Sequence, residues 1–369
     1  MRTRNFDIAV VGGGLVGAAL AYGIAGGEVG AARVVMLDEG DHALRAARGN
    51  FGLIWVQGKG AHFPAYARWT LNSARRWPEL AHRLHDDTGL DVGLSQRGGL
   101  HLCLSEQERV VRTKLVESDG GEGARLEMLD RAALRDVVPD LGPDVVAASF
   151  GRDDGHVNPL MLLRALHTGF AHLGGTLVVD AGVRSVSYAR GIFTLTGTHT
   201  SVQAKRIVLA AGLGNAALAP QVGLVAPVTA QRGQIIVLER MPPLLPLPIE
   251  TLRQTTDGTM LLGDSHEDVA NTATSTGVLA AIANHALRAL PRLAEARVMR
   301  CWAALRVLTS DGMPIYDASA SAPGAFVATS HSGVTLAAVH ALELAPQLAA
   351  GTLDPALTAF SGQRLRAAA

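Results

Sequence analysis

The stretch Ile8-Ala-Val-Val-Gly-Gly-Gly-Leu-Val-Gly17, followed by Val34-Val-Met-Leu-Asp38, decides the fold of this chain. Its pattern is that of a buried strand, a glycine turn, a helix and a second strand that ends in an acid. Gly12 permits the tight turn, Gly14 lets the backbone approach a pyrophosphate at the helix N-terminus, and Gly17 lets the helix pack on the strand. The terminal acid is placed to accept a ribose hydroxyl. We therefore predict a dinucleotide-binding unit, although this motif alone does not separate NAD from FAD.

Composition limits the classes to which the protein can belong. The chain has 369 residues, of which 48% are hydrophobic and 18% charged, with a formal net charge of zero. This length suits two domains or one large composite with a substantial core. The balanced charge gives no reason to expect a nucleic-acid or anionic-lipid partner. Residues 8–25 carry no charge, but the three glycines and the following strand favour a nucleotide fold over a signal peptide or transmembrane segment. We expect a cytoplasmic protein, free or peripheral at a membrane.

The cysteines and histidines predict no metal site. Cys103 and Cys301 are the only cysteines, too few for an iron–sulfur cluster and no basis for a disulfide framework. His82 and His85 share an i,i+3 spacing, but no third ligand lies nearby. A solvated helix face is the favoured interpretation of this pair.

Periodicity along the rest of the chain predicts alternating mixed and antiparallel segments rather than consecutive domains. Helices are expected at 63–88, 105–117, 130–137, 159–173, 276–294 and 333–350, and strands at 99–104, 176–179, 183–188, 193–196, 205–214, 234–239, 250–255, 259–263 and 325–329. The Pro-rich segment 241–248 is interpreted as an extended connecting loop rather than a ligand for another protein.

Several motifs, taken in order, resemble the FAD-dependent amino-acid oxidase family, which includes D-amino-acid, glycine and sarcosine oxidases. Beyond the first motif these are Arg48-Gly-Asn-Phe-Gly52, Ala210-Ala-Gly212, Arg232-Gly-Gln234, Trp302-Ala-Ala-Leu-Arg-Val-Leu-Thr-Ser-Asp-Gly-Met-Pro314 and His331-Ser-Gly-Val-Thr-Leu-Ala337. In the fourth of them, Ala304 and Val307 replace the glycine and proline that the family usually has. The resemblance covers essentially the whole chain.

The resemblance implies an α/β fold: a glutathione-reductase-type, Rossmann-like FAD-binding domain intertwined with a substrate domain built on a mixed, largely antiparallel sheet. The FAD-binding domain is expected to comprise residues 1–80, 146–219 and 305–369, and the substrate domain 81–145 and 220–304. The implied cofactor is noncovalent FAD, because Cys301 is displaced from the attachment position of sarcosine oxidases. Its expected contacts are Gly12, Gly14, Leu15, Val16, Gly17, Asp38, Glu39, Arg48, Gly49, Asn50, Phe51, Gly52, Leu53, Val183, Ala210, Ala211, Gly212, Arg306, His331, Gly333, Val334, Thr335 and Leu336.

Within this family, the variants of the motifs are similar to flavoproteins of multi-subunit dehydrogenases, such as D-hydroxyproline dehydrogenase β, opine oxidase B and hydrogen cyanide synthase C. In that branch, sister subunits carry an iron–sulfur cluster and a second flavin. The implied reaction oxidises an amino or imino acid, with a D-hydroxyproline as first choice, to the imine by hydride transfer to flavin N5. Electrons would then pass to the partner subunits. Two alternatives are a self-contained glycine- or sarcosine-type oxidase that makes hydrogen peroxide and a non-catalytic subunit that only relays electrons.

The resemblance also assigns catalytic and substrate-binding roles. Arg306, predicted to lie just after an apolar strand, is expected to anchor the substrate carboxylate through its planar fork, the alternative being a structural salt bridge with, for example, Asp311. His331 is either an acid/base catalyst or a histidine packed beside the flavin. Substrate contacts are expected among Arg253, Gln254 and His266, with Glu267 nearby, and ordinary polar residues at a sheet edge are the alternative. The roles of three further residues are left as alternatives. Asn50 either hydrogen-bonds to the flavin or stabilises the turn of its loop, and Trp55 packs either in the core or on the flavin. Lys59 either activates oxygen as a cation beside the flavin or has no part in the reaction.

Overall fold

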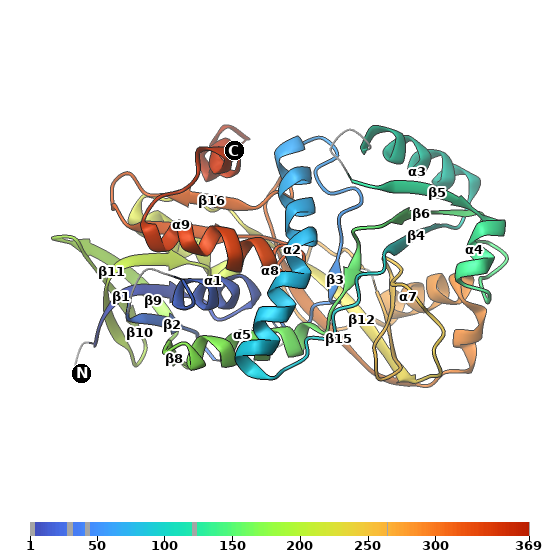
Figure 1. Cartoon of the computed structure of the whole chain (residues 1–369), viewed down its shortest axis with the longest axis horizontal. Coiled ribbons are helices and arrows are strands. Elements are labelled where there is room, and N and C mark those ends of the chain that lie inside the picture. Colours follow the sequence, from blue (N-terminus) through green and yellow to red (C-terminus); the bar gives the residue numbers. More distant parts are fainter. Residues whose placement is uncertain (1–3, 28–31, 41–44, 120–123, 264, 369) are drawn as a thin grey trace.

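The computed structural model describes residues 4–27, 32–40, 45–119, 124–263 and 265–368. Two halves lie side by side along the longest axis of the molecule (Figure 1). One half is built on an eight-stranded sheet, and the other on a four-stranded and a three-stranded sheet. The long helix α2 (Pro64–Thr88) stands between them.

The eight-stranded sheet has the order β16-β17-β11-β1-β2-β8, extended by the hairpin β9-β10 beside β11. Its five strands from β17 to β8 run parallel, as expected for a nucleotide-binding fold. The strands are β1 (Arg4–Val11), β2 (Val34–Leu37), β8 (Thr176–Val178), β9 (Val183–Ala189), β10 (Ile192–Gly197), β11 (Ser201–Leu209), β16 (Ile315–Ala318) and β17 (Ala325–Thr329).

Helices cover this sheet because the parallel strands are apolar on both faces. Val10 and Val208 contribute to the core shared with α1 and α5, whereas Ala9 and Leu209 contribute to the opposite core. The helices of this half are α1 (Leu15–Ala25), α5 (Pro159–His172), α6 (Asn215–Leu218), α8 (Ala337–Val339) and α9 (Ala345–Ala350), and their apolar residues share cores with the strands.

The other half carries the four-stranded sheet β13-β14-β12-β15, which is antiparallel throughout. Its strands are β12 (Thr229–Arg240), β13 (Leu252–Gln254), β14 (Thr259–Leu262) and β15 (Val298–Leu308). The three-stranded sheet contains β4 (Gly99–Cys103), β5 (Leu126–Asp130) and β6 (Ala147–Gly151), and a two-stranded pair contains β3 (Leu53–Ile54) and β7 (Gly155–His156). The helices here are α3 (Glu106–Asp119), α4 (Arg131–Val137) and α7 (Thr276–Ala289).

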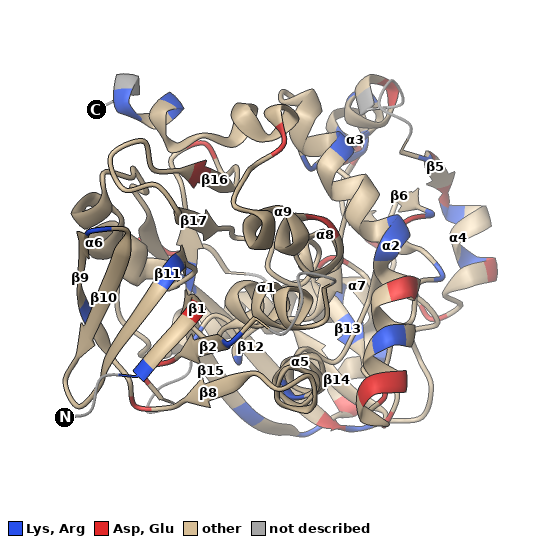
Figure 2. Ribbon diagram, turned by 60° about the vertical axis from the view of Figure 1, so that its left-hand side comes forward, with Lys and Arg blue, Asp and Glu red and all other residues tan. Residues whose placement is uncertain are grey.

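Local sequence explains where the helices begin and end. Asn158 caps α5 by accepting hydrogen bonds from Leu160 and Met161 N–H, and Asp130 caps α4 by accepting from Ala133 N–H. Gly89 ends α2 in the left-handed conformation, φ 69°. Acidic and basic bands alternate along α2 (Figure 2), as its solvated face requires.

Two predicted helices differ from the structure. The helix predicted at 276–294 ends at Ala289, because Pro291 follows and begins a short 3₁₀ segment. The final helix begins at Ala337 rather than at residue 333, since 333–336 form a turn that leads into it. Residues His340–Leu344 are π-helical and end two residues before Pro346, which has no N–H for the regular i→i−4 bond.

The α/β architecture is confirmed, and the two halves are intertwined in sequence. Two of the expected domain boundaries do not coincide with the boundary between the two halves. β6 begins one residue after position 146, inside the expected FAD-binding domain, but pairs with β4 and β5 of the second half. β15, also of the second half, continues past position 305. The division into domains at these positions therefore stays a proposal. No helix among the described residues is long and apolar enough to cross a membrane.

Candidate functional site

The turn between β1 and α1 accepts only glycine at two positions. Gly12 has φ 107°, and a Cβ there would lie 2.4 Å from the Ala210 carbonyl oxygen. A Cβ on Gly17 would lie 1.9 Å from the Gly12 carbonyl oxygen. At Gly14, by contrast, the first atom a Cβ would meet is Ala47 Cβ at 3.8 Å. The backbone is thus packed tightly behind the turn and open in front of the α1 N-terminus, which fits a bound pyrophosphate.

Further observations on α1 agree with an anionic ligand. Its first turn carries no acidic residue, and its N-cap residue, Gly14, has no side chain that could cap the helix. The first N–H groups of a helix have no acceptor within the helix, and the helix dipole favours negative charge there. The residues present therefore fit the diphosphate of a dinucleotide.

Asp38 and Glu39 lie where the ribose and adenine end is expected. Asp38 Oδ2 accepts a hydrogen bond from Gly13 N–H at 2.7 Å, so it is held against the glycine turn. Its carbonyl accepts from Ala181 N–H at 2.7 Å, which brings the chain just before Val183 alongside. Glu39 is exposed, and a Cβ on Gly182 would lie 3.9 Å from Glu39 Cβ. The three predicted contacts Asp38, Glu39 and Val183 are thus brought together.

The loop 48–53 runs between the two halves. A Cβ on Gly49 would lie 2.2 Å from Ala304 Cβ on β15, and one on Gly52 would lie 2.4 Å from the Val157 carbonyl oxygen. Asn50 Oδ1 accepts a hydrogen bond from Gly52 N–H at 2.7 Å, which supports the loop-turning alternative for this residue. The loop is therefore fixed against the four-stranded sheet.

The segment 331–336 closes the site from the other side. Leu336 N–H donates to the Ser332 carbonyl at 2.9 Å, so the N–H groups before it begin a helical turn and have no acceptor within that turn. Thr335 Oγ1 accepts from Trp55 N–H at 3.1 Å. Lys59 Nζ donates to Ser332 Oγ at 2.7 Å. This turn and the segment after loop 48–53 are thus tied together.

The side chains at this closing segment bear on three open assignments. His331 is exposed, whereas residues 332–336 are buried. Trp55 is 7% exposed, and a Cβ on Gly99 would lie 2.6 Å from its ring, so Trp55 packs against β4. Lys59 is engaged by Ser332, which agrees with a structural role.

One face of the four-stranded sheet is directed at loop 48–53. The register places Trp302 opposite Ile235, and Leu261 opposite Val237, on this face. These apolar residues form a cluster with Phe51 from the loop. The opposite face of the sheet packs on α7, and Cys301 points to that side. The sheet thus forms an apolar wall beside the loop predicted to hold the flavin.

Arg306 lies on the same face as Trp302, and it lies inside β15 rather than just after a strand as predicted. A Cβ on Gly233 would lie 2.6 Å from the Arg306 guanidinium carbon, so the glycine makes room for this side chain. Arg306 Nη1 donates to the carbonyl oxygens of Arg232 and Ser265. Asp311, the example given for a structural salt bridge, pairs with Arg364 at 2.8 Å.

The other predicted substrate residues separate into different environments. Arg253 is buried on the wall, opposite Leu261. Gln254 is fully engaged by the loop 241–248 and by Gly258: Oε1 accepts from Leu244 N–H at 2.7 Å, and Nε2 donates to Pro242 O at 2.9 Å. His266 is exposed beside Gln231. We therefore leave Gln254 and His266 out of the proposed substrate site.

Glu267 is engaged in the structure of the sheet. Its carboxylate pairs with Arg232 and accepts from Gln234 Nε2 at 2.8 Å. The hydrogen bond from Arg232 lowers the pKa of Glu267 below its usual value. The Arg-Gly-Gln motif on β12 thus holds the segment around Glu267 against the sheet.

Sequence reasoning missed a buried polar group behind the loop, at residues 154–157. Asp154 is fully buried and accepts hydrogen bonds from Val56 N–H and Gln57 Nε2, both at 2.6 Å. Burial raises the pKa of Asp154 to about 7. Burial, with the charge of Arg253, lowers the pKa of His156 to about 4. The run Gly151-Arg-Asp-Asp-Gly-His156 just after a strand was the signal that pointed to such a polar turn.

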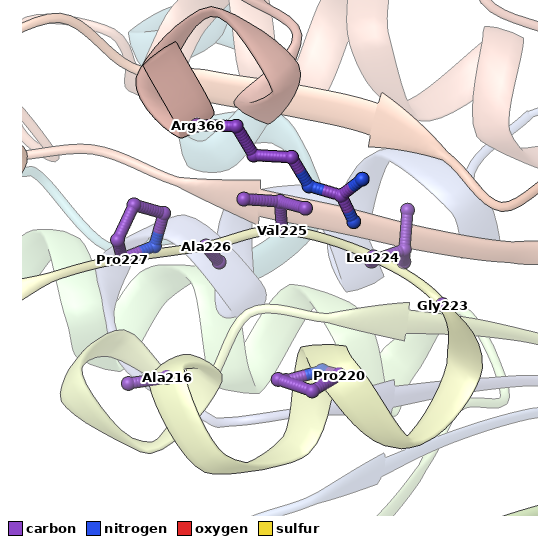
Figure 3. Close-up of a pocket in the computed structure, with 8 residues that line it drawn as sticks. All are labelled: Ala216, Pro220, Gly223, Leu224, Val225, Ala226, Pro227 and Arg366. Carbon is purple, nitrogen blue, oxygen red and sulfur yellow. The ribbon is translucent and has the colours of Figure 1, made fainter. Parts of the chain in front are cut away.

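A cavity of about 300 Å³ lies away from this site (Figure 3). Residues 223–227 line it with Ala216 and Pro220, and the exposed Arg366 extends over it. None of the residues predicted to bind cofactor or substrate lines the cavity, so we assign it no role. Among the described residues, no group of three or more His, Cys, Asp or Glu side chains is arranged to hold a metal ion.

Comparison with known proteins agrees with this geometry. The family model for FAD dependent oxidoreductases matches residues 7–347. The B subunit of opine oxidase from Agrobacterium tumefaciens (strain Ach5) is 44% identical over 366 residues, covering 98% of each chain. The hydrogen cyanide synthase protein HcnC of Pseudomonas protegens, also a subunit, is 24% identical over 408 residues, covering 99% of this chain and 97% of that one. The crystal structure of glycine oxidase from Geobacillus kaustophilus superposes with a TM-score of 0.87 at 24% identity, covering 96% of both chains.

Proposed function

We propose that this chain, which belongs to the family of FAD-dependent oxidoreductases, oxidises the carbon–nitrogen bond of an amino or imino acid and passes the electrons to partner subunits. The observation that supports this most is the position of Arg306. Its guanidinium projects from the apolar wall that faces loop 48–53, and a planar fork of this kind matches a carboxylate.

The residues of the chain position the substrate and exclude water. Arg306 keeps its Nη1 bonds to two carbonyl oxygens, which holds the fork in one orientation. Trp302, Leu261 and Phe51 supply the apolar surface beside it. Bound FAD would accept the hydride removed from the substrate carbon. The contribution of Arg306 is then mainly orientation of that carbon, which is a proximity effect.

The substrate is proposed at the level of a class. A D-hydroxyproline remains the first choice made from the sequence, and the identity to the opine oxidase relative supports an opine as a second candidate. Both candidates offer a carboxylate for Arg306 and a nitrogen on the adjacent carbon. The turn at 333–336 is proposed to stabilise negative charge on the flavin through its backbone N–H groups. With His331 exposed, an acid/base role for it is not part of this proposal.

Transfer of electrons to sister subunits is supported by two relatives, whose names identify them as subunits of larger enzymes. An iron–sulfur cluster and a second flavin are proposed for those partners from the resemblance to the multi-subunit branch. The presence of only Cys103 and Cys301 agrees with this, because two cysteines are too few to hold a cluster on this chain. The pair of electrons would leave through them, in the cytoplasm or at a membrane surface. The self-contained oxidase is the second candidate. A pure relay is disfavoured because it has no use for Arg306.

The distinction between these candidates predicts a slow reaction with oxygen. With a substrate that reduces its flavin, the FAD-loaded chain should reduce an artificial dye at least about tenfold faster than it reduces oxygen. The reason is that Lys59, the one lysine near the site among the described residues, is engaged by Ser332. Dye reduction and hydrogen peroxide are measured in parallel. Stoichiometric peroxide at a rate comparable with dye reduction would favour the self-contained oxidase.

The attachment of the cofactor gives a further prediction. Acid or heat should release FAD intact and leave a colourless polypeptide, because Cys301 points to the α7 side of the sheet and Cys103 lies buried in β4. The released flavin is identified by chromatography and its absorbance spectrum. Flavin that stays on the denatured chain would contradict noncovalent binding.

A further inference from the structure

Arg253 is a buried cation on β13, the edge strand of the sheet that forms the apolar wall. It occupies the middle of β13, opposite Leu261, while its neighbours Leu252 and Gln254 point to the other face. Arg253 is 3% exposed, less than most arginines in folded proteins. Its side chain thus shares the face of the sheet that carries Arg306.

No carboxylate of the described residues forms an ion pair with Arg253. The guanidinium donates from Nη1 to the Val157 carbonyl at 3.2 Å, and its Nε is buried without a partner. Burial lowers the pKa of Arg253 to about 10, so the group is still charged at pH 7. A buried, unpaired charge is costly, and such groups are concentrated where a ligand supplies the missing partner.

The surroundings of Arg253 connect it with the site. A Cβ on Gly52 would lie 3.4 Å from the Arg253 guanidinium carbon, so the cation lies against the loop predicted to hold the flavin. His156, which pairs with Leu53, is close enough to feel the charge of Arg253, and burial lowers the pKa of His156 to about 4, so it is neutral at pH 7. Asp257 is too distant to pair with Arg253 but adds a weak negative field. One positive charge therefore lies beside the loop 48–53 with no ion-pair partner among the described residues.

We infer that Arg253 binds a second carboxylate of the substrate, so that the protein oxidises amino acids carrying an additional acidic group distant from the α-carboxylate. This inference rests on the proposed function, in which Arg306 holds the α-carboxylate. Arg253 lies opposite Leu261, which in turn lies opposite Val237 on β12, and the Arg306 guanidinium lies over Gly233, four residues from Val237 on the same face of that strand. At about 3.3 Å per extended residue, Gly233 and Val237 are roughly 13 Å apart along the sheet. A dicarboxylic amino acid or an N-carboxyalkyl amino acid spans such a gap.

The test compares matched substrates that differ in one charge. The probes are N-carboxymethyl-, N-(2-carboxyethyl)- and N-(3-carboxypropyl)glycine, each beside the analogue with a terminal carboxamide. Reduction of the FAD-loaded chain is followed anaerobically by flavin bleaching, and binding by the flavin difference spectrum. For the chain length that reaches Arg253, the acid should exceed the amide about 10- to 100-fold in kcat/KM, the range of a charge-assisted hydrogen bond. Arg253→Gln should reduce this ratio to about one and leave the amide within about threefold.

Arg240→Gln is the matched control, because Arg240 lies on β12 of the same sheet but is exposed and pairs with Asp257 at the surface. It should keep the wild-type ratio of acid to amide. Equal losses for acid and amide in Arg253→Gln, at unchanged melting temperature, would show that Arg253 serves the flavin and would overturn the inference. A wild-type ratio near one for every pair would overturn it as well. If no probe bleaches the flavin, the proposed function fails for this class, and the ratio of dissociation constants from the difference spectra still decides the role of Arg253.

Discussion

Arg306→Lys is expected to retain FAD but to lower kcat/KM about 30- to 200-fold for a substrate with an α-carboxylate, equivalent to about 2–3 kcal/mol for a charge-assisted bidentate contact. Lysine keeps the positive charge but replaces a planar fork with a point charge. One ammonium cannot hold both the Ser265 carbonyl and two carboxylate oxygens in the geometry that the guanidinium permits. The reacting carbon would then leave its position. Steady-state dye reduction and flavin content measure the two parts of this result.

A substrate amide and a second variant make this result specific. The amide, which lacks the carboxylate, should be a poor substrate of the wild-type protein and lose little more on Arg306→Lys. Asp311→Asn breaks the ion pair with Arg364 instead and should leave kcat/KM within about threefold, because Asp311 pairs with Arg364, outside the proposed site. If acid and amide lose activity equally on Arg306→Lys, the residue supports the sheet and does not bind substrate.

Gly12→Ala is expected to remove FAD from the purified protein and to destabilise the fold by about 2–6 kcal/mol. Of this, about 1–3 kcal/mol is backbone strain at φ 107°, and about 1–3 kcal/mol is the contact of the new Cβ with the Ala210 carbonyl at 2.4 Å. Relief of that contact moves the turn away from β11, and the N–H groups of α1 no longer converge on the pyrophosphate. Flavin absorbance per protein and denaturant unfolding measure the two effects.

Two other glycines separate the contributions to this result. Gly191→Ala has a similar positive φ of 78°, but nothing lies within 4 Å of the added Cβ at this hairpin tip. It should cost about 1–2 kcal/mol and leave FAD bound. Gly14→Ala has an ordinary φ of −72°, so it should leave the fold stable and weaken FAD alone. Normal FAD content in both Gly12→Ala and Gly14→Ala would remove the turn from the cofactor site.

Much of the nucleotide-binding half could be predicted from the sequence, because its signals are local. The glycine spacing from Gly12 to Gly17 and the apolar strands on either side of α1 each describe a few consecutive residues. Helix limits followed where a cap or a proline marks them, as Asn158 does for α5. The start of the last helix was wrong by four residues, because 333–336 contain no residue that separates a turn from a first helical turn.

The substrate side was less predictable, because it depends on pairs that are distant in sequence. Arg306 was expected after a strand, yet it pairs with Gln231 across the sheet, which no local pattern reveals. Likewise, Arg253 faces Gly52, which lies about two hundred residues earlier in the sequence. The side chain of Gln254 is instead hydrogen-bonded to the nearby loop 241–248. Adjacent residues on one strand thus have opposite environments. Alternation predicts that they differ, but only the packing of the sheet shows which of the two faces the site.

Anaerobic mixing of the FAD-loaded chain with amino and imino acids tests the central claim most directly. The absorbance of the flavin is followed without any partner subunit, dye or oxygen. The account predicts complete bleaching by at least one substrate that carries an α-carboxylate next to a primary or secondary amine, and no bleaching by the same amine without its carboxylate. A flavin that dithionite reduces but that no amino or imino acid bleaches, or one that the decarboxylated amine bleaches equally fast, would contradict the account.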